Sequence, residues 1–188
     1  VDTGHGFDFL PSHSQMGKYQ TWIDEDPYAI FCFEQNIVDP LLGETYDYIV
    51  FDSTNSSGDL FQDAVLTAAP NLVIPLLSGP GSEGGLDRLL TGPVQKLSEH
   101  RDVSVLAVMP NRFAGNNDER QLVNRLSEDY PQFVPPFATT DMLETSPGPG
   151  IRQSKSIDRA WREGVPLSAY DSEHVNNERF AQLAEVIA

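Results

Sequence analysis

The sequence has a single cysteine, Cys32, which excludes an internal disulfide and leaves no metal site built from thiolates. It also lacks any apolar run of the roughly 20 residues that a membrane-spanning helix needs. The four histidines, at positions 5, 13, 100 and 174, lie far apart and share no spacing typical of metal ligands. We predict that they are surface or loop residues and that the protein is cytoplasmic.

Basic residues are scarce, and lysine is the scarcest. Lys18, Lys96 and Lys155 are the only lysines among 12 basic residues, against 28 acidic ones, and the formal net charge is −16. Such a surface is expected of a halophilic protein, because molar salt shortens the Debye length to about 3 Å and screens self-repulsion. The alternative is an acidic protein that avoids nucleic acid. At low salt this charge opposes DNA binding, whereas in molar salt it decides little.

The apolar and aromatic content, 39% and 10% of 188 residues, is enough for one folded domain. Strand patterns alternate with helical ones, which predicts an α/β fold, doubly wound, with a mainly parallel sheet flanked by helices. The predicted strands are 7–10, 46–51, 72–76, 103–109 and 133–137. The predicted helices are 17–24, 28–42, 59–69, 83–100 with a kink at Pro93, 118–128, 156–163 closed by Gly164, and 175–187. We expect the last helix to bury Phe180, Leu183, Ala184 and Ile187.

The most informative stretch is Tyr46–Asp52, an apolar segment that ends on a carboxylate and runs into the small, polar loop 53–58. Open α/β sheets place a charge beside a ligand by ending a buried strand on such a residue. The alternative is a core strand followed by an ordinary turn that begins with Asp52.

Further motifs follow Asp52 in the sequence. Residues 46–90 resemble the ParA/MinD family of partition ATPases, whose members carry Y-D-Y-I-I-I-D, then a helix, then L-I-P, then a G-L entry to another helix. The matching residues are Tyr46, Asp47, Tyr48, Asp52, Ile74, Pro75, Gly85 and Leu86. Two further segments, Phe7–Ser12 and Ile151–Asp171, are similar to the family's L-D-L-I-P-S strand and its I-R…A…G-x-P…Y-D segment.

The chain departs from the family pattern at two kinds of site. The family's P-loop, K-G-G-x-G-K-T, and its acidic D-x-D-P-Q-like loop are absent, and both belong upstream of the segment at 7–12. Because the chain also starts at Val1 and not at a methionine, we expect that an N-terminal portion is missing. The family's D-x-P-P loop is Asp52–Asn55 here, without prolines, so the rigidity of that loop differs.

The resemblance implies a role for Asp52 as the Walker B carboxylate, which holds Mg²⁺ directly or through water, and for loop 53–58 as a switch that senses the γ-phosphate. Asn111 and Arg112 follow the strand at 103–109 and resemble the Asn-Arg step of MinD-like members. An Asn amide offers a donor and an acceptor to the edge of adenine, and Arg112 would lie over the base or ribose. The alternative is an Asn in a turn after a strand.

Arg152, Lys155, Arg159 and Arg162 form the one concentrated basic stretch of the sequence. The resemblance implies that they bind the DNA backbone non-specifically, since arginine pairs well with phosphate. The alternative is a solvated helix face paired with Asp158 and Glu163.

Taken together, the resemblance implies a ParA-like ATPase that binds ATP and Mg²⁺, forms a homodimer, binds DNA on the nucleoid and works with a ParB-like centromere-binding protein. One alternative is a degenerate member without a P-loop that acts as a scaffold. Another is a MinD-like positioning ATPase. A membrane role is disfavoured, because residues 177–188 carry no basic cluster.

Overall fold

A computed structural model describes residues 1–11, 16–26, 28–53, 60–79 and 81–188. The chain forms two compact units. The first, here called the helical unit, comprises Val1, Phe9–Asn71 and Gly85–Ser104. The second, the sheet unit, comprises Asp2–Asp8, Leu72–Gly84 and Val105–Ala188.

The helical unit contains α1 (Met16–Glu25), the turns η1 (Ala29–Phe31) and η2 (Glu34–Val38), α2 (Asp39–Leu41) and α3 (Leu60–Ala68). Helix α4 (Ser82–Leu89) is shared between the units and continues as η3 (Leu90–Val94) and α5 (Gln95–Ser98). The predicted disturbance at Pro93 is confirmed: the proline lies inside η3, a π-helical turn that separates α4 from α5. Helix α3 packs on α1 and η1 and buries Ala64, Val65 and Leu66.

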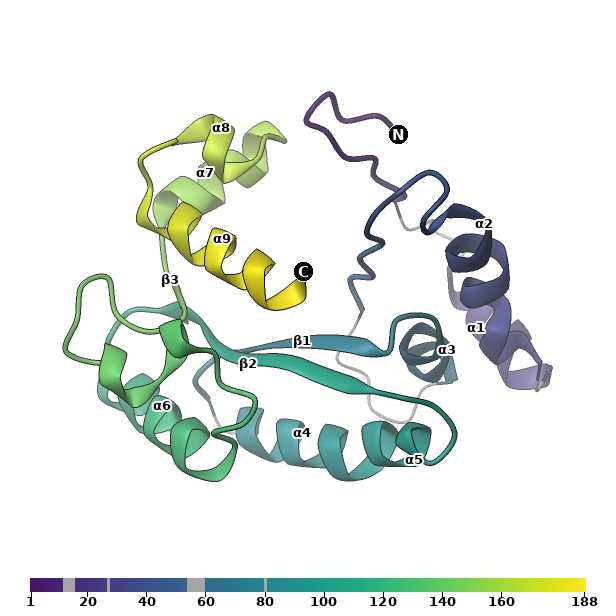
Figure 1. The fold of residues 1–188 in the computed structure, drawn as a ribbon, viewed down its shortest axis with the longest axis horizontal. Coiled ribbons are helices and arrows are strands. Elements are labelled where there is room, and N and C mark those ends of the chain that lie inside the picture. The colour runs from purple at the N-terminus through teal and green to yellow at the C-terminus, as the bar shows by residue number, and fades with distance from the viewer. Residues whose placement is uncertain (12–15, 27, 54–59, 80) are drawn as a thin grey trace. The chain divides into compact units, whose positions relative to one another are not determined.

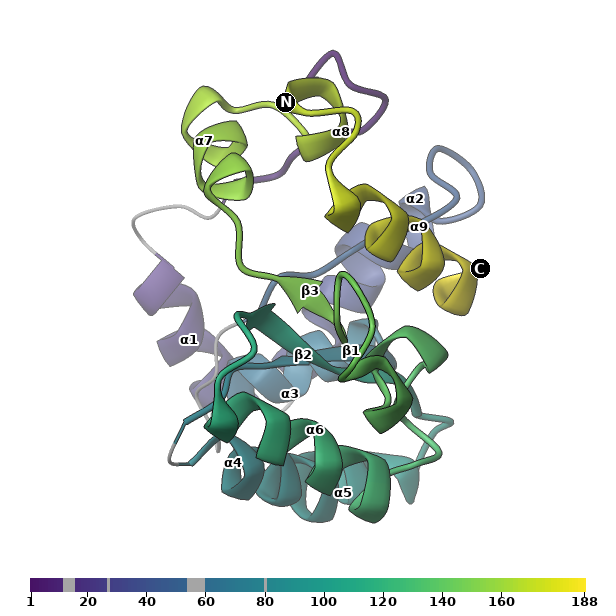
Figure 2. The ribbon, with the colours of Figure 1, turned by 90° about the vertical axis from the view of Figure 1, so that its left-hand side faces the viewer.

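The sheet unit is built on a small parallel sheet with strand order β1–β2–β3, from β1 (Asn71–Leu76), β2 (Ser104–Phe113) and β3 (Ile151–Arg152). Strand β2 is central, and its run Ala107–Pro110 is buried without alternation because both faces of the sheet are covered. Helix α6 (Asn117–Asp129) lies on one side and α9 (Val175–Ile187) on the other (Figures 1 and 2). The α/β class with a helix-flanked parallel sheet is therefore confirmed at this level.

Local signals explain where the helices of this unit begin and end. Asn116 caps α6, and its capping box with Glu119 is complete. Helix α7 (Lys155–Glu163) begins after the cap Ser154 and ends at Gly164, which has a φ of 67° as predicted for a C-terminal glycine. The remaining elements are the short helices η4 (Pro136–Ala138), η5 (Thr140–Met142) and α8 (Leu167–Tyr170).

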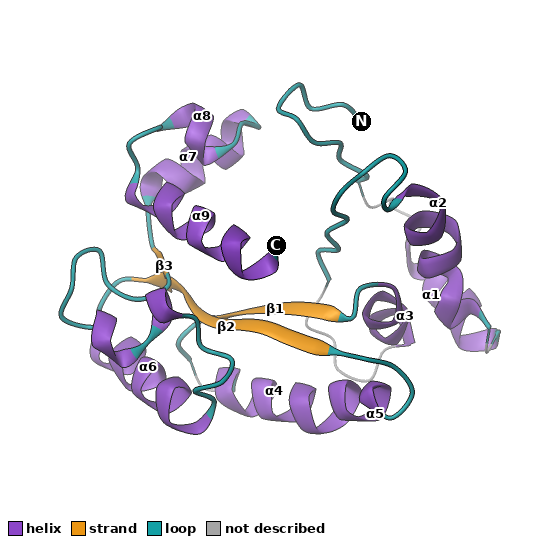
Figure 3. Cartoon of the chain, viewed as in Figure 1, coloured by secondary structure: helices purple, strands orange, loops and turns teal. Residues whose placement is uncertain are grey.

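Three predicted strands are wrong. Residues 47–53 are irregular (Figure 3), and Val50 is 90% exposed. Residues 7–10 hold only an isolated antiparallel bridge between Asp2 and Asp8. A strand needs backbone partners from another strand. In the described part of the chain no strand pairs with residues 47–53, and the backbone of residues 7–9 pairs with residues 1–3 just before it and with no strand of the sheet. Residues 133–137 fail for a local reason: Pro135 and Pro136 have no N–H to donate, and a 3-10 turn forms instead.

The expected buried face of the last helix is also wrong. Phe180 and Ile187 on α9 are exposed, whereas Asn176 and Arg179 are buried. The polar pair replaces the apolar stripe because both side chains find hydrogen-bond partners on the neighbouring backbone.

Candidate functional site at the carboxyl ends of β2 and β3

Asn111 and Arg112 lie where the parallel pairing of β2 and β3 becomes irregular. Asn111 pairs with Ile151 and Phe113 pairs with Arg152, so Arg112 is an extra residue on β2, a β-bulge. Its φ of 57° is left-handed, the one such value at a non-glycine residue among those described. Left-handed backbone at a residue with a side chain is unfavourable and is tolerated mainly at sites with a function. The exposed Arg112 side chain is thereby aimed by a bulge, not by regular pleating.

Asn111 keeps hydrogen-bonding capacity for a ligand. Its Oδ1 accepts the Arg112 backbone N–H at 2.9 Å, which fixes the orientation of the amide. A second lone pair on Oδ1 and both Nδ2 hydrogens remain, and no bond to them is found in the described part of the molecule. A donor and an acceptor side by side suit the edge of a purine or another flat amide-like group.

The loop before β3 approaches the end of β2 so closely that only glycine fits. A Cβ at Gly150 would lie 2.1 Å from the Pro110 carbonyl oxygen, and the φ of Gly150 is 64°. At Gly148 a Cβ would lie 3.2 Å from the Phe113 ring, with a φ of 92°. Both glycines therefore set the distance between Asn111–Arg112 and the start of α7. In the sequence, the G-P-G run at 148–150 indicates a loop but not this close approach to β2.

Asn176 and Arg179 of α9 hold this edge from the other side. The fully buried Asn176 side chain accepts from the Arg152 N–H at 3.0 Å and donates to the Arg152 carbonyl at 2.8 Å. Arg179, only 4% exposed, donates to the Gly148 carbonyl at 3.1 Å, and its guanidinium lies 5.9 Å from the centre of the Phe137 ring. These two residues were missed by sequence analysis, because polar residues in a helix are ordinarily solvent-facing.

The four predicted DNA-binding residues come together on β3 and α7. Arg152, Lys155, Arg159 and Arg162, here called the basic cluster, are all exposed. No ion pair joins them to an acidic side chain in the described ranges, although Asp158 and Glu163 lie on the same helix. Other arginines are paired: Arg101 with Glu34, Arg120 with Glu144, and Arg125 with Glu83, whose hydrogen bond raises the pKa of Arg125. The alternative interpretation, in which Asp158 and Glu163 pair with the cluster, is therefore not seen among the described residues.

Ser154 and His174 form a contact that resembles a catalytic pair but has the wrong proton arrangement. The Ser154 Oγ lies 2.7 Å from His174 Nε2, while His174 Nδ1 accepts the Asn176 N–H at 3.1 Å. A neutral ring that accepts at Nδ1 carries its proton on Nε2, so it donates to Ser154 and cannot take the serine proton. The two residues act as caps: Ser154 for α7 and His174 for α9.

Asp52 belongs to the helical unit, whereas the other predicted site residues belong to the sheet unit. It is exposed at the end of the irregular segment 47–53. A single exposed carboxylate is a poor site for Mg²⁺ by itself, because it supplies only one of the oxygen ligands that the ion needs. The remaining ligands would have to come from water and from phosphate oxygens. No group of three or more potential metal-ligating side chains occurs among the described residues. Of the predicted switch loop, residues 54–58 lie outside the described ranges.

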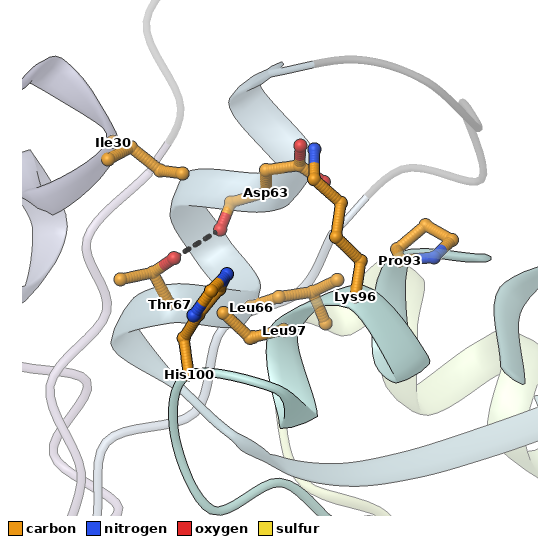
Figure 4. A pocket seen from close by; sticks show the side chains of 8 residues that line it. All are labelled: Ile30, Asp63, Leu66, Thr67, Pro93, Lys96, Leu97 and His100. Carbon is orange, nitrogen blue, oxygen red and sulfur yellow. Dashed lines mark hydrogen bonds between the residues drawn. The ribbon is translucent and has the colours of Figure 1, made fainter. Parts of the chain in front are cut away.

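The helical unit contains a small cavity of about 110 Å³ (Figure 4). It is lined by Ile30, Asp63, Leu66, Thr67, Pro93, Lys96, Leu97 and His100. The Thr67 hydroxyl already donates to the Asp63 carbonyl at 2.7 Å, so it offers no spare donor to the cavity. Ligand sites typically hold about 300–1,000 Å³. None of the predicted site residues lines this cavity, and a nucleotide would not fit in it.

Comparisons with known proteins point to a distant archaeal relative. An uncharacterized protein of Methanocaldococcus jannaschii is 25% identical to this chain over 178 residues. The match covers 95% of this chain but 64% of that protein, so this chain spans less than two thirds of its relative's length. No family model matches the chain. No solved structure matches it. In the described residues, no helix is both long and apolar enough to span a bilayer.

Proposed function

We propose that this chain is the larger part of a ParA/MinD-like partition ATPase with a doubly wound, P-loop-type fold. In this proposal the whole protein binds ATP and Mg²⁺, forms a homodimer around nucleotide and binds DNA non-specifically through the basic cluster. A ParB-like partner would stimulate hydrolysis and so drive DNA segregation on the nucleoid. The ordered motif matches support the family, and the helix-flanked parallel sheet is compatible with its fold.

The observation that carries the proposal is the bulge at Arg112. Ligands of open α/β sheets bind beyond the carboxyl ends of the strands. Here that edge presents Asn111 with free hydrogen-bonding capacity, a left-handed Arg112, and directly after β3 the capped α7 with its basic cluster. The arrangement suits the base end of a nucleotide at Asn111–Arg112.

This chain offers few groups that could bind the phosphates of a nucleotide. Phosphates are held by a lysine and a nest of backbone N–H groups in P-loop proteins, and the K-G-G-x-G-K-T run that supplies both is absent from the 188 residues. Asp52 is the residue that would contribute to a Mg²⁺ shell. Bound Mg²⁺ would neutralise phosphate charge, while the residues of this chain bind and orient the base.

The test is ATP binding by calorimetry in molar KCl with Mg²⁺, with this chain compared with the protein expressed from its complete gene. The proposal is supported if the complete protein binds ATP and if Asn111→Ala weakens that binding about tenfold. A loss of this size is typical of one hydrogen bond between uncharged groups. A matched control is Asn124→Ala, which removes an exposed amide on α6. If the complete protein binds no ATP, the scaffold without nucleotide is the better account.

A further inference from the structure

One large aromatic side chain, that of Trp161, is exposed to solvent within the same stretch of sequence as the basic cluster. Trp161 on α7 is 81% exposed, the highest exposure of any large aromatic side chain in the described residues. Single exposed apolar residues are normal on protein surfaces. What distinguishes Trp161 is its place: it directly precedes Arg162 on the helix and follows Arg159 by two positions.

Helix geometry gives the three cations of α7 one face and places Trp161 beside the Arg162 edge of that face. At 100° per residue, Lys155, Arg159 and Arg162 lie within about 60° of one another, whereas Trp161 lies about 100° from Arg162, about 120° from Lys155 and about 160° from Arg159. Ala160 and the half-buried Ile157 face inward. Asp158 is exposed between the two faces, and no ion pair with Arg162 or Lys155 forms in the part of the chain that is described. Arg162 and the indole are therefore available to one ligand together, and a ligand that also reaches Lys155 and Arg159 has to bend round the helix.

We propose that α7 binds single-stranded nucleic acid, with the basic cluster on the phosphates and Trp161 stacked on an unpaired base. The inference rests on the proposed DNA-binding function and specifies its ligand. Exposed aromatic rings beside a cationic groove are the means by which proteins hold single strands without reading sequence. A duplex keeps its bases stacked inside, so it offers phosphates to the arginines but no base to the indole.

Charge supports a polyanion over a protein partner. The chain carries −16 overall, yet four of its 12 basic residues lie within residues 152–162, and no ion pair to any of them is found among the described residues. In an acidic protein, exposed arginines that leave neighbouring carboxylates unpaired are suited to an external anion with closely spaced charges. A single-stranded chain is flexible enough to place successive phosphates along the roughly 10 Å between Lys155 and Arg162 while one base turns onto Trp161.

The test is fluorescence anisotropy with the complete protein and labelled oligo(dT), oligo(U) and a duplex of equal length, titrated with KCl. We expect Trp161→Ala to weaken oligo(dT) binding about tenfold with an unchanged salt slope, and to leave duplex binding unaffected. Trp161→Phe should restore most of the affinity. Trp22→Phe is the matched control, since Trp22 is half-exposed on α1 in the other unit. Arg159→Ala should lower the salt slope by about 0.7.

The possible outcomes separate the two proposals. If Trp161→Ala changes the affinity for neither the single strand nor the duplex while Arg159→Ala weakens duplex binding, base stacking on Trp161 is overturned and binding to the DNA backbone stands. If Trp161→Ala instead changes only the elution volume of the protein, the indole contacts a second copy, which also overturns the inference. If no nucleic acid binds at any salt concentration, both the inference and the DNA-binding part of the proposed function fail. An equal loss for oligo(dT) and oligo(U) would support single strands of either sugar.

Discussion

The side chain of Asn176 takes the place of a missing strand beside Arg152. It accepts from the Arg152 N–H at 3.0 Å and donates to the Arg152 carbonyl at 2.8 Å, the two bonds that a neighbouring strand would make. Through this contact, α9 fixes the short strand β3 from which α7 and the basic cluster begin. A buried asparagine thus links the end of the sheet to the candidate binding surface.

Replacing Asn176 with alanine should destabilise the protein by about 2–4 kcal/mol, because two buried backbone groups lose their partners at once. Urea unfolding followed by circular dichroism measures the change. Asn124→Ala is the control, since that side chain is exposed on α6 and should shift stability by less than about 0.5 kcal/mol. Equal midpoints for the two variants would show that Asn176 does not hold β3.

Gly150 and Gly85 make a second matched pair. A Cβ at Gly150 would overlap the Pro110 carbonyl oxygen in a backbone conformation that alanine disfavours, so Gly150→Ala should cost about 2–4 kcal/mol. Gly85 lies within α4 and a Cβ there would meet nothing within 4 Å, so Gly85→Ala should stabilise by up to about 1 kcal/mol. Thermal unfolding of both variants gives the signs. A tolerated Gly150→Ala would mean that the loop is free to move away from β2.

These contacts mark the boundary of what the sequence alone could predict. Helices α6, α7 and α9 were placed to within about two residues, because caps such as Asn116 and Gly164 are local signals. The strands β1 and β2 were recognisable because a short apolar run is also a local signal. The segment at 46–51 was wrongly predicted to be a strand, because a strand depends on a partner elsewhere in the chain.

The candidate site divides in the same way. The basic cluster was visible because its members lie within one short stretch, and the resemblance to a family pointed to Asn111 and Arg112. The contact of Asn176 with Arg152 joins residues 24 positions apart, and no pattern in the sequence announces it. The bulge that aims Arg112 was equally hidden, because it arises from the register of β2 against β3.

Cys32 gives a prediction about pH. Burial raises the pKa of its thiol above the ordinary value, because desolvation disfavours the thiolate. The folded state therefore holds this proton more tightly than the unfolded state. Its contribution to stability is complete below the ordinary thiol pKa of about 8.5 and is lost as pH rises through the higher folded value.

Alkylation by iodoacetamide should accordingly be slow in the native protein near pH 8 and fast after unfolding in urea. In Cys32→Ala the decline of stability above about pH 9 should be shallower than in the parent protein, as measured by urea midpoints between pH 7 and pH 10. Native alkylation as fast as that of free cysteine would contradict the burial of the thiol.

Replacing Arg112 with glycine should raise the stability of the protein and weaken nucleotide binding. Its left-handed backbone is unfavourable for arginine and natural for glycine, so Arg112→Gly should raise the free energy of unfolding by up to about 1 kcal/mol. Arg112→Ala keeps the strain and should gain nothing. If the guanidinium contacts nucleotide, both variants should weaken ATP binding by the complete protein to a similar extent, measured by calorimetry. A residue that is strained without binding would give the stability gain alone, and the strain would then belong to the bulge and not to a ligand site.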